Sequence, residues 1–413
     1  ATGETTQRIL FSEIDKMAWL EDHSSGFYAP GVASIGEGRF AIFGGLQLNA
    51  LGNAGRKGKK IHVLDLENPN SELSLEEVGD MPSYAAGLDD ESGEVTTRHG
   101  ASATLLTKGV HAGKVLVAGG TSTRSASEDI TDSAFLFDPN TNEVTSLNAE
   151  DSMDTGHYLH KAVQDAMGNV VILGGWEATE ADFVAFNNRF DFYDASAGAF
   201  NKRIADRTLL SGGLSGMAAP LGTAGVVYCG GAIIRTGSTW ESESACSLIT
   251  TSGVISNEIP PLPAPLSHGS MVALSSNELL VIGGVSTSPK QDIVGTTSDA
   301  ESWVFYYDHL DGEWQELSEL QLPRANAALE LLPDGRVLVL GGRLNAHLFS
   351  EGETDTDEIL ACVEVYDPFV ALNQPSQEAS TLLNGCSAAS VTSDLPTRVH
   401  SMSTAQDPRH GVI

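Results

Sequence analysis

Val337-Leu338-Val339-Leu340-Gly341-Gly342 is a short apolar run that ends in a glycine doublet. Runs of this kind occur five more times and end in the doublets Gly44-Gly45, Gly119-Gly120, Gly174-Gly175, Gly230-Gly231 and Gly283-Gly284. The last five doublets follow one another at about 55 residues, a spacing typical of a repeat architecture. The first interval is longer because it contains an acidic insertion around residues 87–94.

The residues around each doublet indicate four antiparallel strands per repeat. The runs are short, rich in β-branched residues and bounded by glycine, which favours buried strands over helices. A strand of small residues precedes each run, as in residues 99–106, and small side chains fit a crowded innermost strand. A third strand ends in a turn, as at Tyr366-Asp367-Pro368, and a fourth is clearest from Trp314 onward. Four such strands form one blade.

This order of strands resembles the Kelch repeat, and the resemblance covers nearly the whole chain. Its most specific elements are the glycine doublets and Tyr366-Asp367-Pro368. The resemblance implies an all-β fold, namely a Kelch-type β-propeller of seven four-stranded blades, with six blades as the alternative count. It also implies a propeller of the bacterial secreted type. The blade with Ser247-Leu248-Ile249-Thr250 departs from the pattern because it lacks the aromatic-Asp ending.

The ends of the chain are out of phase with the repeat. We expect residues 1–6 to be a flexible lead-in and residues 7–413 to form a single propeller domain. Blades are expected to start near residues 28, 97, 157, 213, 266, 323 and 398. Residues 7–21 resemble a third and a fourth strand, whereas residues 399–405 and 411–413 resemble a first and a second. Pairing the two halves would complete the last blade and remove exposed strand edges.

The charge of the chain is strongly negative, with 55 acidic and 23 basic residues and a net charge of -32. A polyanion of this size is repelled by phosphate backbones and anionic lipid surfaces, which argues against nucleic acid as a partner. No stretch of 18 apolar residues predicts a membrane span. We expect no cofactor, with calcium at the acidic loops as the alternative.

The four cysteines are Cys229, Cys246, Cys362 and Cys386. None forms a CxxC pair, so a zinc or thioredoxin motif has no support. Each pair falls on neighbouring strands of one blade, so we expect the disulfides Cys229–Cys246 and Cys362–Cys386, with four buried thiols as the alternative. Disulfides imply export, so the expected location is secreted, extracellular or at the cell surface, with the periplasm as an alternative.

One face should carry both the starts of the innermost strands and the long loops 46–60, 176–188, 285–301 and 343–360. A column at those starts contains four histidines among Pro30, His99, His160, Ser215, His268, Ala325 and His400. Histidine is a common metal ligand, but seven strand starts form a ring too wide for one ion, so we assign no metal site. The candidate binding residues at this mouth are Arg98, His99, Tyr158, His160, Trp176, His268, Arg324, Asn326, Arg398 and His400.

A basic patch stands out in so acidic a chain and comprises Arg56, Lys57, Lys59 and Lys60. One interpretation is a solvated loop tip. The other is an interface in self-assembly, in which the patch meets an acidic segment such as residues 351–358 of another copy.

The predicted function is an extracellular or cell-surface binding or assembly module that recognises a protein partner or a glycan through the loop-rich face. No catalytic residues are assigned, because no triad, P-loop or dinucleotide fingerprint is present. The alternative is a carbohydrate-active enzyme with its site at the axial mouth. Two enzyme types of this architecture are relevant, the galactose-oxidase-like copper enzymes and the sialic-acid-mutarotase-like enzymes. The first type needs a Tyr cross-linked to a Cys, and no such partner is evident.

Overall fold

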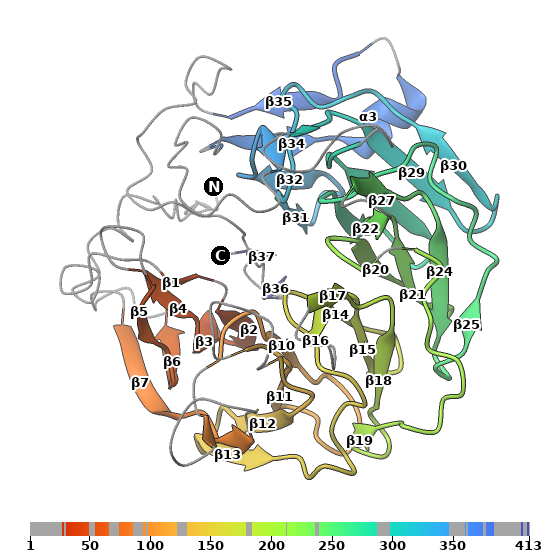
Figure 1. The fold of residues 1–413 in the computed structure, drawn as a ribbon. Helices are drawn as coiled ribbons and strands as arrows, with labels where there is room; N and C mark the ends of the chain where they lie inside the picture. Colours follow the sequence, from red (N-terminus) through yellow and green to blue (C-terminus); the bar gives the residue numbers. More distant parts are fainter. Residues whose placement is uncertain are drawn as a thin grey trace.

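The computed structural model describes residues 27–28, 30–48, 54–65, 74–85, 94–95, 98–121, 130–178, 184–211, 213–235, 239–286, 298–346, 360, 362–374, 377–383, 406–407 and 411–412. Within these residues, six four-stranded antiparallel sheets are arranged around one axis (Figure 1). Each sheet is a blade, and the innermost strand of each blade lies nearest the axis.

Blade 1 comprises β2 (Gly31–Gly36), β3 (Arg39–Phe43), β6 (Lys60–Asp65) and β7 (Ser74–Asp80). Blade 2 comprises β10 (Ser102–Leu105), β11 (Val115–Ala118), β12 (Ala134–Asp138) and β13 (Glu143–Ser146). Blade 3 comprises β14 (Lys161–Gln164), β15 (Val170–Leu173), β18 (Phe190–Asp194) and β19 (Ala199–Phe200).

Blade 4 comprises β20 (Met217–Leu221), β21 (Gly225–Cys229), β24 (Cys246–Thr250) and β25 (Ile255–Ser256). Blade 5 comprises β26 (Ser270–Ala273), β27 (Glu278–Ile282), β29 (Val304–Asp308) and β30 (Glu313–Glu316). Blade 6 comprises β31 (Ala328–Leu331), β32 (Val337–Leu340), β34 (Val363–Tyr366) and β35 (Ser380–Leu382).

Shorter strands extend from the blades. They are β1 (Phe27–Tyr28), β4 (Leu46–Leu48), β5 (Ala54–Lys57), β8 (Tyr84–Ala85), β9 (Glu94–Val95), β16 (Trp176–Ala178), β17 (Val184–Phe186), β22 (Ala232–Arg235), β23 (Thr239–Ser242), β28 (Ser298–Asp299) and β33 (Asn345–Ala346). The helix α3 (Pro368–Asn373) separates β34 from β35. Asp367 caps this helix by accepting a hydrogen bond from the Val370 N–H at 3.0 Å. Tyr366-Asp367-Pro368, which the sequence predicted to end in a turn, therefore leads into a helix.

The hydrophobic core lies between neighbouring blades. The second strands β11 and β15 are buried along their whole length, which agrees with the apolar runs before the glycine doublets. Phe43 of blade 1 packs edge-to-face against Phe135 and Phe137 of blade 2. Core clusters of this kind lie between each pair of successive blades from blade 1 to blade 6, so the ring behaves as a series of sheet-on-sheet contacts.

The glycine doublets join each blade to the next. The N–H of Gly284 donates to the Arg324 carbonyl at 2.7 Å, and Gly45 donates to the Arg98 carbonyl at the same distance. Gly44 has a φ of +60°, and a Cβ at this position would lie 2.2 Å from the Arg98 carbonyl oxygen. Glycine is therefore required both by the left-handed backbone and by the close approach of the next blade.

The departure of blade 4 from the repeat pattern leaves its architecture unchanged. The third strand β24 ends at Thr250 where other blades have aspartate, and the Thr250 hydroxyl accepts the turn hydrogen bond from the Val254 N–H at 3.1 Å. Cys229 and Cys246 lie directly opposite each other on β21 and β24 and form a disulfide. Cys362 is disulfide-bonded as well, and its expected partner Cys386 lies outside the described residues.

The sequence prediction of an all-β, Kelch-type propeller architecture is confirmed by this ring, whereas seven blades and closure by both chain ends stay predictions. The hairpin of β36 (Gln406–Asp407) and β37 (Gly411–Val412) lies near the axis, and β36 contacts β2 (Figure 1). Residues 7–21 and 398–405, which the composite blade also needs, lie outside the described residues.

Candidate functional site

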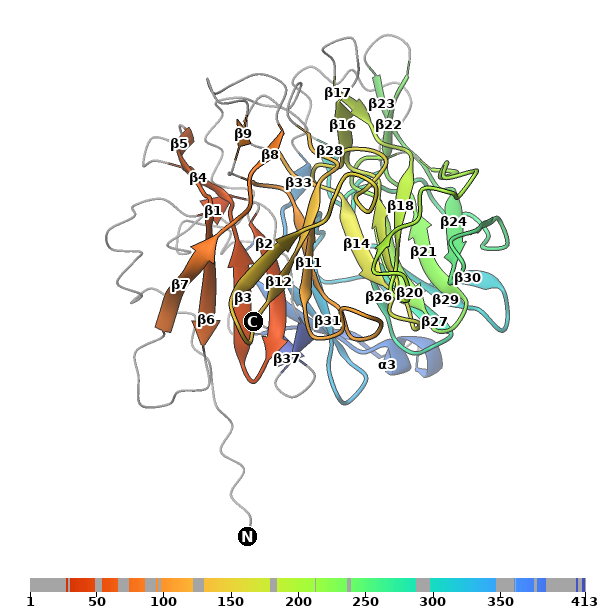
Figure 2. The ribbon, with the colours of Figure 1, turned by 90° about the horizontal axis from the view of Figure 1, so that it is seen from below.

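The two faces of the ring differ in the length of their connections. The strands β4, β5, β16, β17, β22, β23, β28 and β33 extend on one face, and Figure 2 shows them above the blades. We call this the loop face. Strand β28, from the loop of blade 5, pairs with β33, from the loop of blade 6, so these two blades are joined beyond their cores. The opposite face, which we call the turn face, carries tight turns and α3.

The innermost strands enclose a channel that is accessible to solvent. They contact one another in the order β2, β10, β14, β20, β26 and β31. Every described side chain of β10, β14 and β26 is at least partly exposed, although the strands behind them are almost wholly buried. Strands β2, β20 and β31 are mostly buried by contrast, so the solvent-accessible part of the axis, which we call the axial channel, lies at blades 2, 3 and 5.

A backbone collar surrounds this channel on the loop face. Its members precede the innermost strands and have positive φ, between 52° and 66°; they are Gly100, Leu159, Ser215, His268 and Asn326. Within the collar, the N–H of His268 donates to the Ser215 carbonyl at 2.8 Å, and that of Asn326 donates to the His268 carbonyl at 2.7 Å. These hydrogen bonds link one blade to the next beside the axis.

The structure separates the histidines that the sequence aligned in one column. His99 occupies the position before the collar, where it bridges Thr121, and Ala325 occupies the equivalent position and bridges Arg343. His268 is itself a collar residue, whereas His160 follows collar residue Leu159. The prediction of a single column is therefore wrong. Relative to the positive-φ residue of its blade, His99 lies one position earlier, His268 at the same position and His160 one position later. His400 and Arg398 lie outside the described residues.

Arg98 and Arg324 are buried within their blades rather than displayed at the mouth. The Arg324 guanidinium donates to the carbonyls of Gly341 and Cys362, at 2.7 and 2.9 Å, and is paired with Glu364. The Arg98 guanidinium likewise donates to the Gly119 carbonyl at 2.9 Å. We call this contact, between the residue at the head of a blade and the first doublet glycine of the same blade, the head latch.

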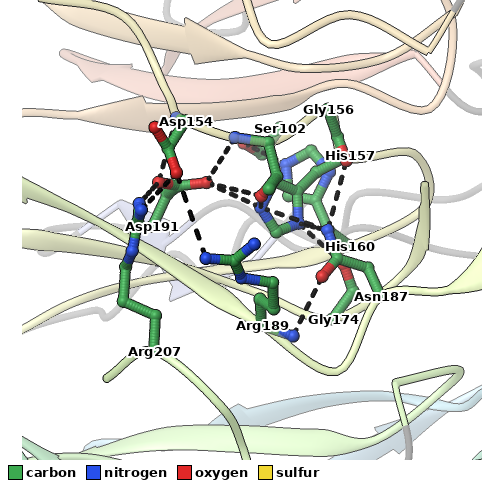
Figure 3. Close-up of polar contacts among 11 residues, drawn as sticks. Ser102, Asp154, Gly156, His157, His160, Gly174, Asn187, Arg189, Asp191 and Arg207 are labelled. Atoms are coloured by element: carbon green, nitrogen blue, oxygen red, sulfur yellow. Dashed lines mark hydrogen bonds and ion pairs between the residues drawn. The ribbon is translucent and has the colours of Figure 1, made fainter. Parts of the chain in front are cut away.

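His157 provides the head latch of blade 3, and the sequence analysis missed it. Its Nδ1 lies 2.9 Å from the Gly174 carbonyl oxygen and its Nε2 lies 3.0 Å from Asp191 Oδ2 (Figure 3). Arg207 completes the cluster, with Nη1 2.7 Å from Asp191 Oδ1. Burial alone would raise the pKa of Asp191, but the hydrogen bond and charge of His157 lower it to about 2. His157 precedes its doublet by the same interval as Arg324, which is the signal that could have found it.

The remaining predicted mouth residues pack around the head latches. His160 lies with Nε2 2.8 Å from the Ser102 hydroxyl of blade 2, and burial and the charge of His157 lower its pKa well below the usual value. Tyr158 and Trp176 are buried in a small apolar cluster, and His99 packs edge-to-face on the Tyr158 ring at 5.4 Å. Binding by these side chains stays a prediction, and their burial gives them a clear packing role.

Two basic residues that the sequence analysis did not select, Lys161 and Arg343, lie close to the collar along the chain or across a bridge. Lys161, the first residue of β14, is exposed although it begins an innermost strand. Burial, and then the charges of Lys161 and Arg343, lower the pKa of His268 to about 4. We call the loop-face end of the channel, beside the collar, the axial opening.

The predicted interface patch is partly neutralised within blade 1. Lys60 Nζ lies 2.9 Å from Asp80 Oδ1 and 2.5 Å from Glu77 Oε1, and Lys59 Nζ lies 3.8 Å from Asp80. Arg56 and Lys57 belong to β5, and their side chains lie outside the described residues, as does the acidic segment 351–358. Self-assembly through this patch stays a prediction.

No group of three or more His, Cys, Asp or Glu side chains that could hold a metal ion occurs among the described residues. In the same part of the chain, no helix has the length and apolar character needed to cross a bilayer. Calcium binding at the acidic loops stays a prediction.

Comparisons with known proteins support the repeat assignment. No family model matches the chain. Two proteins of Arabidopsis thaliana described as F-box/kelch-repeat proteins are 31% and 27% identical to it, each over 27% of this chain. The matched regions span only 29% and 25% of those two proteins. A solved structure entitled "Structure of YjhT" covers 82% of this chain and 94% of its own, with a TM-score of 0.52 and 14% identity. The repeats, the ring of four-stranded blades and these similarities together show a Kelch-type β-propeller fold and support the assignment of the repeats as Kelch repeats.

Proposed function

We propose that the protein is a binding module that recognises a protein partner through its loop face. Kelch repeats support protein–protein interaction as the general function. The observation that carries the proposal is the set of strand extensions from several blades on this one face (Figure 2). Loops and hairpins on a rigid scaffold are the usual location of binding residues, because the scaffold tolerates their variation.

The finer proposal is an extracellular or cell-surface module of the bacterial secreted type, whose partner is a protein or a surface glycan. The Cys229–Cys246 disulfide supports export, because disulfides persist in oxidising compartments. The net charge of -32 supports a partner other than nucleic acid.

The test removes one extension from the loop face. Partners are captured by cross-linking on the full chain, identified and purified, and then titrated against a variant in which Asn-Gly replaces residues 233–241, the β22–β23 hairpin. We expect weaker binding with an unchanged melting temperature. The matched control carries Leu310→Ser and Phe369→Ser, two exposed apolar residues on the turn face. Loss of binding in the control variant alone would contradict the proposal, because the partner would then bind the turn face.

A carbohydrate-active enzyme with its site at the axial opening is the second candidate, and the solvent-accessible channel favours it. Cys229, Cys246 and Cys362 are disulfide-bonded, which leaves no described thiol for the Tyr–Cys cross-link of a galactose-oxidase-like site. Polarimetry of freshly dissolved reducing sugars, sialic acid included, tests the mutarotase-like alternative. A rate above the buffer rate that scales with protein concentration would favour the enzyme.

A further inference from the structure

We propose that a pocket on the loop face, at the boundary of blades 1 and 2, binds a single neutral sugar residue of a glycan. The pocket has a volume of about 240 Å³. Its walls come from the residues that follow β7, from those that precede β12 and from those at and after the end of β13. The inference rests on the proposed recognition by the loop face, and it names a site and a ligand class for the glycan alternative.

The position of the pocket separates it from the axial opening. Strands β7 and β13 are the outermost strands of blades 1 and 2, and β12 lies next to β13. The pocket is therefore displaced from the axis toward the rim of the ring, and a sugar bound there does not use the axial opening.

The main chain around the pocket is held in place by hydrogen bonds. The Asp132 carbonyl accepts from the Met153 N–H at 3.1 Å, and the N–H of Leu147 donates to the Ala134 carbonyl at 3.0 Å. These bonds join the residues before β12 to those after β13. The walls are thus formed before a ligand arrives, which lowers the entropy cost of binding.

Two polar side chains of the lining are available to a ligand. The Asp132 carboxylate is exposed, whereas Ser152 is only 4% exposed. Neither side chain forms a hydrogen bond or an ion pair with any residue that the structure describes, although the neighbouring hydroxyls of Thr131 and Ser133 are bonded to each other at 2.9 Å. Buried hydroxyls normally have a partner, so a group inside the pocket is expected to complete the bonding of Ser152.

The charges of the lining favour a neutral ligand. Asp132 and Arg98 are its only ionisable residues among those the structure describes. The Arg98 guanidinium is buried and donates to the carbonyls of Gly119 and Ser133, at 2.9 and 3.0 Å, so it contributes a fixed positive charge at the floor. This charge disfavours a cation, and the net charge of -32 disfavours an anion.

The donors and acceptors of the lining select a polyhydroxyl compound. A sugar hydroxyl both donates and accepts, so it can donate to the Asp132 carboxylate and exchange hydrogen bonds with the hydroxyls of Ser83 and Ser152. Pro82 and Leu147 add an apolar wall that suits the C–H face of a sugar ring. Sites for drug-sized ligands begin at about 300 Å³, so this smaller pocket fits one ring rather than a longer chain.

Saturation-transfer difference NMR of the full chain tests the pocket, with the methyl glycosides of glucose, galactose, mannose and N-acetylglucosamine as probes. We expect at least one glycoside to receive saturation. Its affinity should fall about tenfold in Asp132→Ala, because a hydrogen bond to a charged group is lost. Ser83→Trp fills the pocket from an exposed position and should abolish the signal. Asp206→Ala is the matched control, because it removes an exposed carboxylate between blades 3 and 4 and should change nothing.

Thermal melts of the three variants accompany the titrations, and Ser83→Trp carries the test alone if Asp132→Ala does not fold. Absence of saturation for every glycoside, or an affinity unchanged in both pocket variants, overturns the inference. Binding of methylguanidinium in place of the glycosides would identify a site for a basic side chain of a protein and would overturn it as well. A negative result here together with a positive hairpin test leaves recognition of a protein by the loop face in place.

Discussion

The guanidinium of Arg324 and the carboxylate of Glu364 lie 3.0 Å apart, and neither side chain has any exposed surface. Arg324 belongs to the head of blade 6 and Glu364 to its third strand, so the pair fixes the link from blade 5 onto blade 6. Glu364 also accepts hydrogen bonds from the Gln321 N–H and the Ser380 hydroxyl. A buried charge with this many partners is satisfied only while all of them stay in place.

Removing one member of this pair should be costly. Glu364→Ala leaves the Arg324 charge buried without a counter-charge, and we expect a loss of about 3–5 kcal/mol in the free energy of unfolding. Urea unfolding of the full chain measures it. Asp334→Ala is the matched control, because its pair with Arg336 is exposed, and it should change nothing measurable. Similar effects of the two substitutions would contradict the stabilising role of the buried Arg324–Glu364 pair.

Asp191 should make the stability of the protein sensitive to acid. Its pKa in the folded chain is about 2, below the ordinary value of 3.8, so the stabilisation is complete above pH 3.8 and is lost as the pH falls toward 2. The shift corresponds to about 2 kcal/mol. Asp191→Asn should therefore be less stable than the wild type at pH 7 and approach it near pH 2 in urea titrations. A constant difference across this range would show that the charge of Asp191 is not the cause.

The titration of His268 should change the free energy of unfolding at a higher pH than the titration of Asp191 does. Burial, together with the charges of Lys161 and Arg343, holds the pKa of His268 near 4, below the ordinary histidine value of 6.5. The unfolded chain then binds the proton more readily, so stability is present above pH 6.5 and is lost between pH 6.5 and 4, by about 3 kcal/mol in all. His268→Gln should flatten this part of the stability profile. In Lys161→Met, the pKa of His268 followed by NMR should rise, and an unchanged pKa would remove Lys161 from the opening.

The Cys229–Cys246 disulfide should stabilise blade 4. It joins residues 17 apart in the sequence, and a loop of this length corresponds to about 3 kcal/mol. Cys229→Ala with Cys246→Ala should lower the free energy of unfolding by that order. Intact-mass measurement after alkylation without reductant should show no label on the wild-type chain. Four labelled thiols would instead indicate a reduced protein and argue against export.

The repeat and the strand order could be predicted because they depend on local sequence. The doublets mark the ends of the second strands in all six described blades. The left-handed backbone favours glycine at each of them, and in blades 1–5 a carbonyl of the next blade also leaves no room for a Cβ. The candidate site was predicted less well. Arg98 and Arg324 were expected at the mouth, but the carbonyls that bind them come from residues far along the chain.

Two further features depend on information that a single sequence does not carry. The register of the collar follows from positive φ at residues such as Leu159 and Asn326, which are not glycine and give no signal. Lys161 of blade 3 and Arg343 of blade 6 both lower the pKa of His268 in blade 5, and only the arrangement of the blades around one axis relates these positions.

The hydrogen bond from the second glycine of each doublet to the next blade, which we call the joint, is made from main-chain atoms alone. Gly45, Gly120, Gly175, Gly231 and Gly284 each donate to the carbonyl of residues as different as Arg98, His157, Gly213, Leu266 and Arg324. The joint therefore sets no requirement on the side chain that begins a blade. Selection can alter those side chains one at a time, and whole units can be duplicated or exchanged, without redesigning the connection. A ring assembled in this way can acquire new recognition chemistry at one position while its neighbours keep their old sequences.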